Sequence, residues 1–135
     1  MTDSIFNSLP AGLPPLDRAH RLQEEAARAG FDWPDAAAMM EKVREEVGEL
    51  ADACARRDSD AVREEIGDLL FVLVNLARFE GLRADACLVE ACEKFTRRFR
   101  TMEAALRAEG KRLEGQTLEA LDALWNDAKR RERDP

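Results

Sequence analysis

The chain has 135 residues, a formal net charge of −7 and a charged fraction of 36%, which together predict a single acidic domain. Its hydrophobic fraction of 45% is normal for a folded protein and argues against extended disorder. The negative charge argues against a general nucleic-acid binder or a basic membrane-surface protein, because phosphate backbones and anionic lipids repel a net-negative body. The longest apolar run, Leu69 to Val74, is much shorter than the ~18 residues of a membrane span.

The cysteines and the single histidine argue against several kinds of site. Cys54, Cys87 and Cys92 form no CxxC pair and lie in helix-like stretches, so we expect reduced, buried thiols. His20 is the only histidine, which leaves too few ligands for a Cys/His zinc site or a His-carboxylate diiron site and makes a Ser-His-Asp hydrolase improbable. The chain starts without a basic and apolar leader, so we expect a cytoplasmic protein.

The composition predicts an all-α fold, because Ala, Leu, Glu and Arg dominate and β-branched residues are sparse. Prolines and a glycine indicate an irregular N-terminal arm over residues 1–13. Asp58 and Thr117 are placed to cap helices, and Gly30, Gly81 and Gly110 are placed to end them. About five helices are therefore expected, over residues 14–29, 34–57, 60–79 and 84–109 and from 117 toward the C-terminus.

Apolar residues on the three central helices recur at alternating three- and four-residue spacing, which is typical of an antiparallel helical bundle. These stripes are Met40, Val43, Val47, Leu50 and Cys54; Val62, Ile66, Leu69, Leu73 and Leu76; and Leu88, Cys92, Phe95, Phe99, Met102 and Leu106. From Leu69 to Ala77 the third helix is apolar on nearly every face, interrupted only by Asn75. Such a helix must be covered on several sides, so we expect a homo-oligomer.

Carboxylates flank the predicted stripes of the second and third helices. At ~100° per residue, Glu46 and Glu49 lead off the edge of one stripe, and Glu65 and Asp68 off the edge of the next, with Asn75 on the same face. If these four acids meet, like charges ~5 Å apart repel by about 3 kcal/mol at an effective dielectric of 20. Such a cluster would raise its own pKa values or bind a cation, for which oxygen ligands favour Mg²⁺ or Mn²⁺. The alternative is that the acids form ordinary pairs on solvated faces.

A group of bases lies on the fourth helix. Lys94, Arg97, Arg98 and Arg100 crowd one short stretch, and beside a metal ion such side chains can bind polyphosphate oxygens. The alternative is that they neutralise the protein's own acids, including Glu93 and Glu103. The sequence leaves both interpretations open.

Aromatic residues lie near the two ends of the predicted domain. Trp125 and Lys129, four residues apart on the last helix, offer an aromatic face and a cation, although a tryptophan at such a position can also simply pack. Phe31, Asp32 and Trp33 are expected to cap and pack a helix junction.

In five segments the sequence resembles the MazG family of all-α nucleoside triphosphate pyrophosphohydrolases, and it looks closest to the second domain of two-domain members. The segments are GFDWPD (30–35), EKVREEVGEL (41–50), EEIGDLLFVLVNLAR (64–78), EKFTRRFRTME (93–103) and LWNDAKRRE (124–132). The family signature, E-E-x-x-E followed by E-x-x-D, is met by Glu45, Glu46, Glu49, Glu65 and Asp68.

The resemblance implies a MazG-like domain over residues 14–132 that hydrolyses nucleoside triphosphates, canonical or non-canonical, to monophosphate and pyrophosphate with Mg²⁺. It assigns metal ligation to Glu46, Glu49, Glu65 and Asp68, with an activated water attacking the α-phosphorus. It also places Lys42 to Glu46, Lys94 to Arg98 and Trp125 around the nucleotide, and it implies a dimer with composite sites.

Further expectations concern single residues and the alternative function. Lys94, Arg97 and Arg98 are expected to neutralise the triphosphate, and Asn75 to hydrogen-bond a ligand carboxylate or the sugar. Glu45 points away from its stripe and is expected to support the site rather than ligate. A non-catalytic module that binds a protein or senses a nucleotide is the alternative, but it would leave the repulsion among the acids without compensation.

Overall fold

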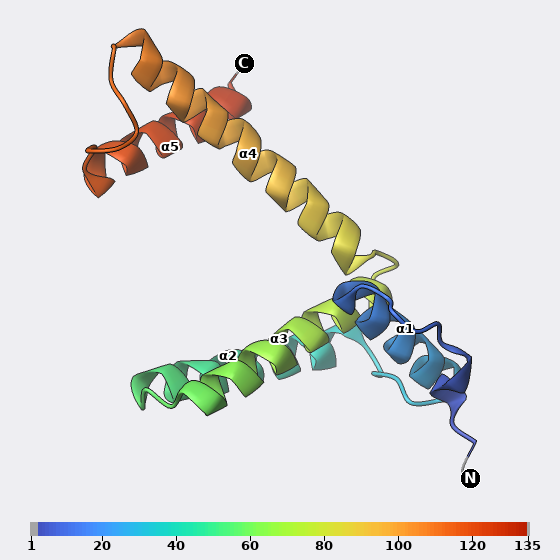
Figure 1. Cartoon of the computed structure of the whole chain (residues 1–135). Coiled ribbons are helices and arrows are strands. Elements are labelled where there is room, and N and C mark those ends of the chain that lie inside the picture. The colour runs from blue at the N-terminus through green and yellow to red at the C-terminus, as the bar shows by residue number, and fades with distance from the viewer. Residues whose placement is uncertain (1–2, 135) are drawn as a thin grey trace. The chain divides into compact units, whose positions relative to one another are not determined.

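The computed structural model describes residues 3–134, in which we find five α-helices and no strand (Figure 1). A short 3₁₀ helix, η1 (Ile5–Ser8), precedes α1 (Pro15–Arg28), α2 (Ala36–Ala55), α3 (Ser59–Phe79), α4 (Ala84–Ala108) and α5 (Leu118–Arg133). The all-α prediction is confirmed. The predicted arm over residues 1–13 contains one 3₁₀ turn, and its first two residues lie outside the described range.

Side-chain caps fix where three of the helices begin. Asp35, Asp58 and Thr117 each accept a hydrogen bond from the backbone N–H three residues later, at 2.8, 3.1 and 3.1 Å. Such a bond satisfies one of the amide groups that the first turn of a helix leaves without a partner. The caps at Asp58 and Thr117 agree with the sequence prediction, whereas Asp35 makes α2 start slightly later than Pro34.

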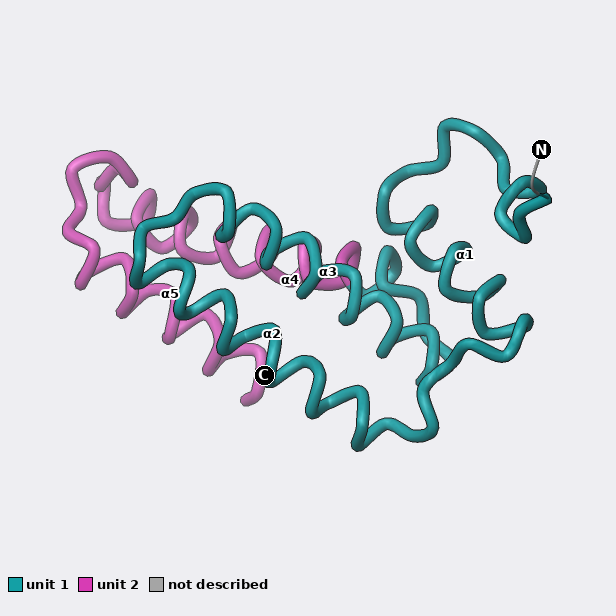
Figure 2. Tube along the Cα trace, turned by 90° about the horizontal axis from the view of Figure 1, so that it is seen from below, with its two compact units in different colours: residues 1–87 teal, residues 88–135 magenta. Residues whose placement is uncertain are grey.

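The chain divides into two compact units, residues 1–87 and residues 88–135 (Figure 2). In the first unit α2 and α3 run along one another as an antiparallel hairpin, and α1 packs against α3 (Figure 1). In the second unit α4 and α5 meet through Phe95 and Trp125, whose ring centroids are 5.3 Å apart. The single domain predicted over residues 14–132 stays a prediction.

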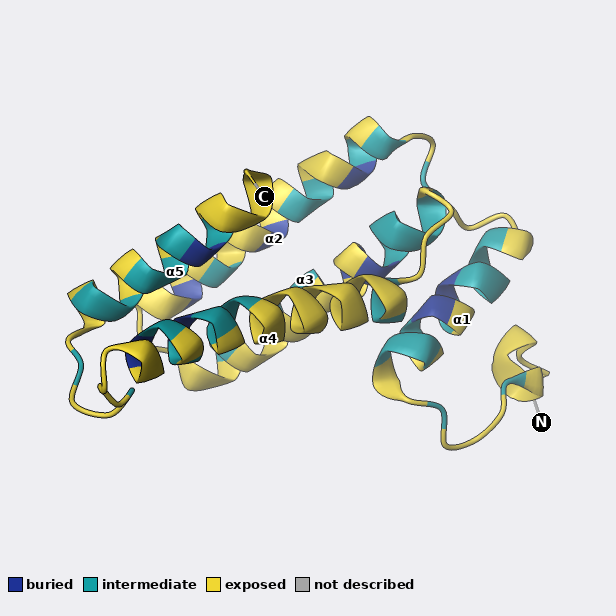
Figure 3. Ribbon diagram, turned by 90° about the horizontal axis from the view of Figure 1, so that it is seen from above, coloured by how far each residue is buried: buried dark blue, intermediate teal, exposed yellow. Residues whose placement is uncertain are grey.

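The buried face of α2 differs from the predicted stripe by one residue (Figure 3). Met39, Glu46 and Ala53 are buried, whereas Met40 and Val47 of the predicted stripe are exposed. The two rows are ~100° apart on the helix and are both largely apolar. Periodicity alone therefore could not decide which of them faces α3.

The expected stripes of the other helices are partly correct. Val72 and Val74 are buried on α3 together with half-buried Leu69 and Leu76, but Ile66 and Leu73 are exposed. On α4, Met102 and Leu106 are buried as predicted, whereas Leu88, Cys92 and Phe95 are exposed.

The expectation of buried thiols is wrong, because Cys54, Cys87 and Cys92 are all free and exposed. Cys54 belongs to the exposed row of α2 that contains Met40 and Val47. None of the helices within residues 3–134 is long and apolar enough to cross a membrane. The cytoplasmic location stays a prediction.

Candidate active site

Three carboxylates meet between α2 and α3. Glu46 and Glu49 come from α2 and Glu65 from α3, and one ligand oxygen from each lies within 4.8 Å of the others. The hairpin brings them together because the two helices run antiparallel, with Glu46 in the buried row of α2 and Glu49 and Glu65 less buried beside it. The structure therefore gathers three of the four predicted metal ligands.

Two of these acids have oxygens that are buried without a hydrogen-bond partner. Glu46 is only 5% exposed, and Oε2 of Glu46 and Oε2 of Glu65 find no partner among the described residues. A buried carboxylate oxygen without a donor costs free energy, because it has lost its water. A set of carboxylate oxygens that lacks donors is what a hard divalent cation requires, so these residues fit a Mg²⁺ or Mn²⁺ ion.

Lys42 holds the other oxygen of Glu46. Its Nζ lies 2.9 Å from Oε1 of Glu46 and 3.6 Å from Oε1 of Glu45, which is itself exposed. The hydrogen bond with Lys42 lowers the pKa of Glu46 against the opposing effect of desolvation, and the same bond raises the pKa of Lys42. Glu46 is thus kept ionised and oriented, and its Oε2 is left available.

Glu65 is in a different electrostatic position. Desolvation raises the pKa of its carboxyl to about 7, helped by the protonated form's ability to donate hydrogen bonds to Glu46 and Glu49. The neighbouring negative charges of Glu49 and Glu46 act in the same direction. Without a cation, Glu65 therefore keeps its proton to a higher pH than an ordinary glutamate does.

Asp68 lies outside this group of three. It follows Glu65 by three residues on α3 and is exposed, which places it about 4.5 Å further along the helix axis and ~60° around it. The structure thus does not place the fourth predicted ligand among the other three.

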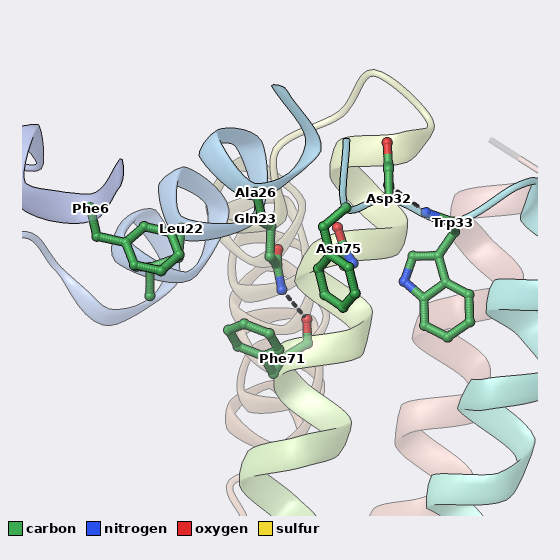
Figure 4. Close-up of a pocket in the computed structure, with 9 residues that line it drawn as sticks. Phe6, Leu22, Gln23, Ala26, Asp32, Trp33, Phe71 and Asn75 are labelled. Atoms are coloured by element: carbon green, nitrogen blue, oxygen red, sulfur yellow. Dashed lines mark hydrogen bonds between the residues drawn. The ribbon is translucent and has the colours of Figure 1, made fainter. Parts of the chain in front are cut away.

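Asn75 lies farther along α3, away from the carboxylates, in a cavity of about 540 Å³ between α1, the 31–33 segment and α3 (Figure 4). Its Oδ1 accepts a hydrogen bond from Nε of Arg78 at 2.8 Å, and Arg78 also pairs with Asp32. The Phe31–Trp33 turn, expected only to cap and pack a junction, therefore also lines a cavity.

Two of the predicted phosphate-binding bases, Arg97 and Arg98, form ion pairs with one acid, Glu132. The Nε atoms of Arg97 and Arg98 lie 2.9 Å from Oε1 and Oε2 of Glu132, respectively. The hydrogen bond from Arg98 is the main cause of the lowered pKa of Glu132. These arginines do neutralise an acid of their own unit, but it is Glu132 rather than Glu93 or Glu103.

The remaining predicted contacts also belong to the second unit. Lys94 is exposed and Lys129 half-buried, and neither forms an ion pair within residues 3–134. Trp125 packs against Phe95, and the guanidinium carbon of Arg98 lies 5.6 Å from the centre of its ring.

Sequence reasoning missed two residues that matter here, Glu132 and Gln23. Glu132 lies in a run of charged residues at the C-terminal end of α5, where nothing in the pattern singles it out. Gln23 offered a weak signal, since it is a polar residue close to the apolar positions Leu22 and Ala26 of the first helix.

Comparison with known proteins defines the class. Residues 35–102, just over half of the chain, match the MazG nucleotide pyrophosphohydrolase domain, so the chain belongs to the MazG family. The match contains the three clustered carboxylates, Asp68 and the bases of α4. Trp125 and Lys129 lie beyond it.

Individual relatives cover more of the chain. It is 40% identical over 133 residues to the nucleoside triphosphate pyrophosphohydrolase of Escherichia coli (strain K12), which is 97% of this chain and 51% of that protein. It is 42% identical over 117 residues to the nucleoside triphosphate pyrophosphohydrolase/pyrophosphatase MazG of Thermotoga maritima, with 87% of this chain and 45% of that protein covered. The chain thus spans about half the length of these curated relatives.

Proposed function

We propose that the chain hydrolyses nucleoside triphosphates, canonical or non-canonical, to the monophosphate and pyrophosphate with the help of Mg²⁺, for which Mn²⁺ can substitute. The observation that carries this proposal is the group formed by Glu46, Glu49 and Glu65, with two buried oxygens that have no partner within residues 3–134. The two relatives described above, both named nucleoside triphosphate pyrophosphohydrolases, support it.

Glu46, Glu49 and Glu65 would hold the cation, and Asp68 is our candidate for a fourth ligand from the next turn of α3. A bound Mg²⁺ supplies charge stabilisation for phosphoryl oxygens and lowers the pKa of water. Lys42 keeps Glu46 ionised and fixes its Oε1, so that Oε2 remains free to ligate. Glu45, exposed and near Lys42, supports this arrangement rather than ligating.

In the reaction, a water oxygen bonds to the α-phosphorus and the bond from that phosphorus to the α,β-bridging oxygen breaks. Pyrophosphate then leaves with the electron pair of that bond, and the attacking water releases a proton to the solvent. Lys94, Arg97 and Arg98 would bind the triphosphate oxygens, because ammonium and guanidinium groups form charge-assisted hydrogen bonds to phosphate. Trp125 and Lys129 are candidate contacts of the nucleotide on the same unit.

We also propose that the protein is a homodimer or a higher homo-oligomer. An apolar row on the first unit is exposed, made of Met40, Val47, Ile66, Leu70 and Leu73, with Val47 48% exposed. At ~100° per residue, Val47 and Ile66 lie on the side of the α2–α3 hairpin opposite Glu49 and Asp68. A second copy could therefore cover the row while the carboxylates stay accessible.

Two measurements test these proposals. A pyrophosphate-release assay with a panel of NTPs and dNTPs should show turnover that requires Mg²⁺ or Mn²⁺. If no nucleotide releases pyrophosphate with either ion, the chain is not this enzyme, and nucleotide binding without turnover would instead support the sensing module. Size-exclusion chromatography with light scattering should give an oligomer, and a folded monomer at micromolar concentration would contradict the second proposal.

A further inference from the structure

The carboxylate of Glu132 bridges two arginines of the second unit. Its Oε1 accepts a hydrogen bond from Nε of Arg97 and its Oε2 accepts one from Nε of Arg98, both at 2.9 Å. The arginines lie in the middle of α4 and the acid lies in the last turn of α5. One anion thus joins two guanidinium groups, which is also what a phosphate group does when it binds between two arginines.

Each arginine uses only part of its hydrogen-bonding capacity on Glu132. A guanidinium group carries N–H donors on Nε and on both Nη atoms. No hydrogen bond from an Nη atom of Arg97 or Arg98 is found within residues 3–134, and the side chain of Arg97 is 59% exposed. A phosphate group can therefore bind the Nη atoms before either Nε leaves Glu132.

A second contact, independent of Glu132, orients Arg98. Its guanidinium carbon lies 5.6 Å from the centre of the Trp125 ring, which is a cation–π contact. That ring in turn packs against Phe95, with 5.3 Å between the ring centroids. Arg98 can therefore keep its orientation when the carboxylate moves away, so the loss of Glu132 leaves a formed anion site.

We infer that Glu132 is an internal competitor of the substrate's phosphates: it occupies Arg97 and Arg98 in the free chain, a triphosphate displaces it, and it returns as pyrophosphate leaves. The inference rests on the proposed function, because it concerns bases that are assigned there to the triphosphate. Every anion that uses both arginines must break the same two bonds. Glu132 therefore weakens the binding of substrate and of pyrophosphate by one common factor, which limits inhibition by the product.

The test measures anion binding without catalysis. The chain has two tryptophans, so Trp33→Phe leaves Trp125, beside Arg98, as the single fluorophore. Inorganic tripolyphosphate is titrated into this protein at low ionic strength, with EDTA present so that no cation is bound at the carboxylates. We expect Glu132→Gln in the same background to lower the Kd of tripolyphosphate about twofold to fivefold, because exposed ion pairs are weak.

The matched control is Glu119→Gln, the same change in the first turn of α5, at an exposed side chain. It should leave the Kd unchanged, because it alters the net charge equally without touching the two arginines. An equal decrease in both variants would show a general effect of charge and would overturn the inference. A higher Kd in Glu132→Gln would also overturn it, since Glu132 would then position the arginines for the anion.

Glu132→Asp keeps the inference testable if Glu132→Gln fails to fold. The aspartate keeps the charge but is one methylene shorter, so it cannot hold both arginines in the same geometry. We expect it to lower the Kd of tripolyphosphate by a smaller factor than Glu132→Gln does. A Kd equal to that of the wild type in both variants would show that the two bonds do not compete with the anion.

Inhibition by pyrophosphate tests the common factor in the active enzyme. In Glu132→Gln the Ki of pyrophosphate should fall by the same factor as the Kd of tripolyphosphate, and an unchanged Ki would overturn the role in product release. If the wild type hydrolyses no nucleotide but Glu132→Gln still binds tripolyphosphate more tightly, the proposed function fails and the competition stands. If the wild type is active and the Kd does not change, the competition fails and the proposed function stands.

Discussion

The two charged groups of this protein, one in each unit, differ in how completely they are paired. In the first unit three carboxylates meet, and two of their buried oxygens have no partner in the described part of the chain. In the second unit Arg97 and Arg98 share both oxygens of Glu132. A paired exposed group contributes little and requires no ligand, whereas buried like charges without donors are costly until a cation neutralises them. The carboxylates therefore require a ligand, whereas the arginines already have a partner in Glu132.

The largest expected effect is the loss of activity in Glu49→Gln. The variant keeps the shape of the side chain but removes one negative ligand from the group, so we expect kcat/KM for a good NTP substrate to fall at least 100-fold, about 3 kcal/mol. Pyrophosphate release measures it. The matched control is Glu64→Gln on the exposed side of α3, which should keep its activity, and full activity in Glu49→Gln would remove the metal assignment.

The second effect is stabilisation by the cation. Because Mg²⁺ would bind the folded carboxylate group but not the unfolded chain, a concentration 100 times its Kd should raise the free energy of unfolding by about 2.7 kcal/mol. Urea denaturation with MgCl₂, against NaCl of equal ionic strength, measures the difference. If Asp68 joins the group when the ion binds, Asp68→Asn should reduce the increase in the free energy of unfolding that MgCl₂ causes. An equal increase in the variant and the wild type would exclude Asp68 as a ligand.

A smaller effect is expected in the second unit, where Glu132 competes with phosphate for two guanidinium groups. We expect Glu132→Gln to lower KM for NTPs roughly twofold to fivefold, since exposed ion pairs are weak. The matched control is Asp127→Asn, which breaks the pairs with Arg130 and Arg131 on the same helix and should leave KM unchanged. A higher KM in Glu132→Gln would mean that Glu132 positions the arginines instead of competing for them.

Local signals in the sequence were enough to predict the helices, because capping residues and glycines act over a few positions. Asp58 and Thr117 cap where the pattern indicated, and Gly81, at a φ of 75° after α3, ends a helix where an L side chain would be strained. The sequence also predicted that Glu46, Glu49 and Glu65 lie close together. The spacing of each residue from the apolar row of its helix indicates the direction in which its side chain points.

The features that the sequence did not predict depend on contacts between segments that lie far apart in the chain. The row of α2 that is buried could not be chosen, because Met39 and Met40 begin two rows of similar hydrophobicity and only the packing of α3 decides between them. The partner of Arg97 and Arg98 lies 34 or 35 residues later in the chain. Gln23 and Asn75 are likewise brought to one cavity only by the packing of α1 on α3.

The smallest effect is the pH dependence of the pair between Glu132 and its two arginines. Hydrogen bonds from Arg98 and then Arg97, opposed by desolvation, hold the pKa of Glu132 in the folded protein below its ordinary value of 4.5. The pair should therefore stabilise the fold above about pH 4.5, and this contribution should disappear as the pH falls through the lowered pKa. The difference in urea midpoint between wild type and Glu132→Gln should be constant from pH 7 to about 5 and shrink below. A difference that persists at pH 3 would show that Glu132 acts by packing rather than by charge, and the contrast between a paired and an unpaired charged group would then no longer hold.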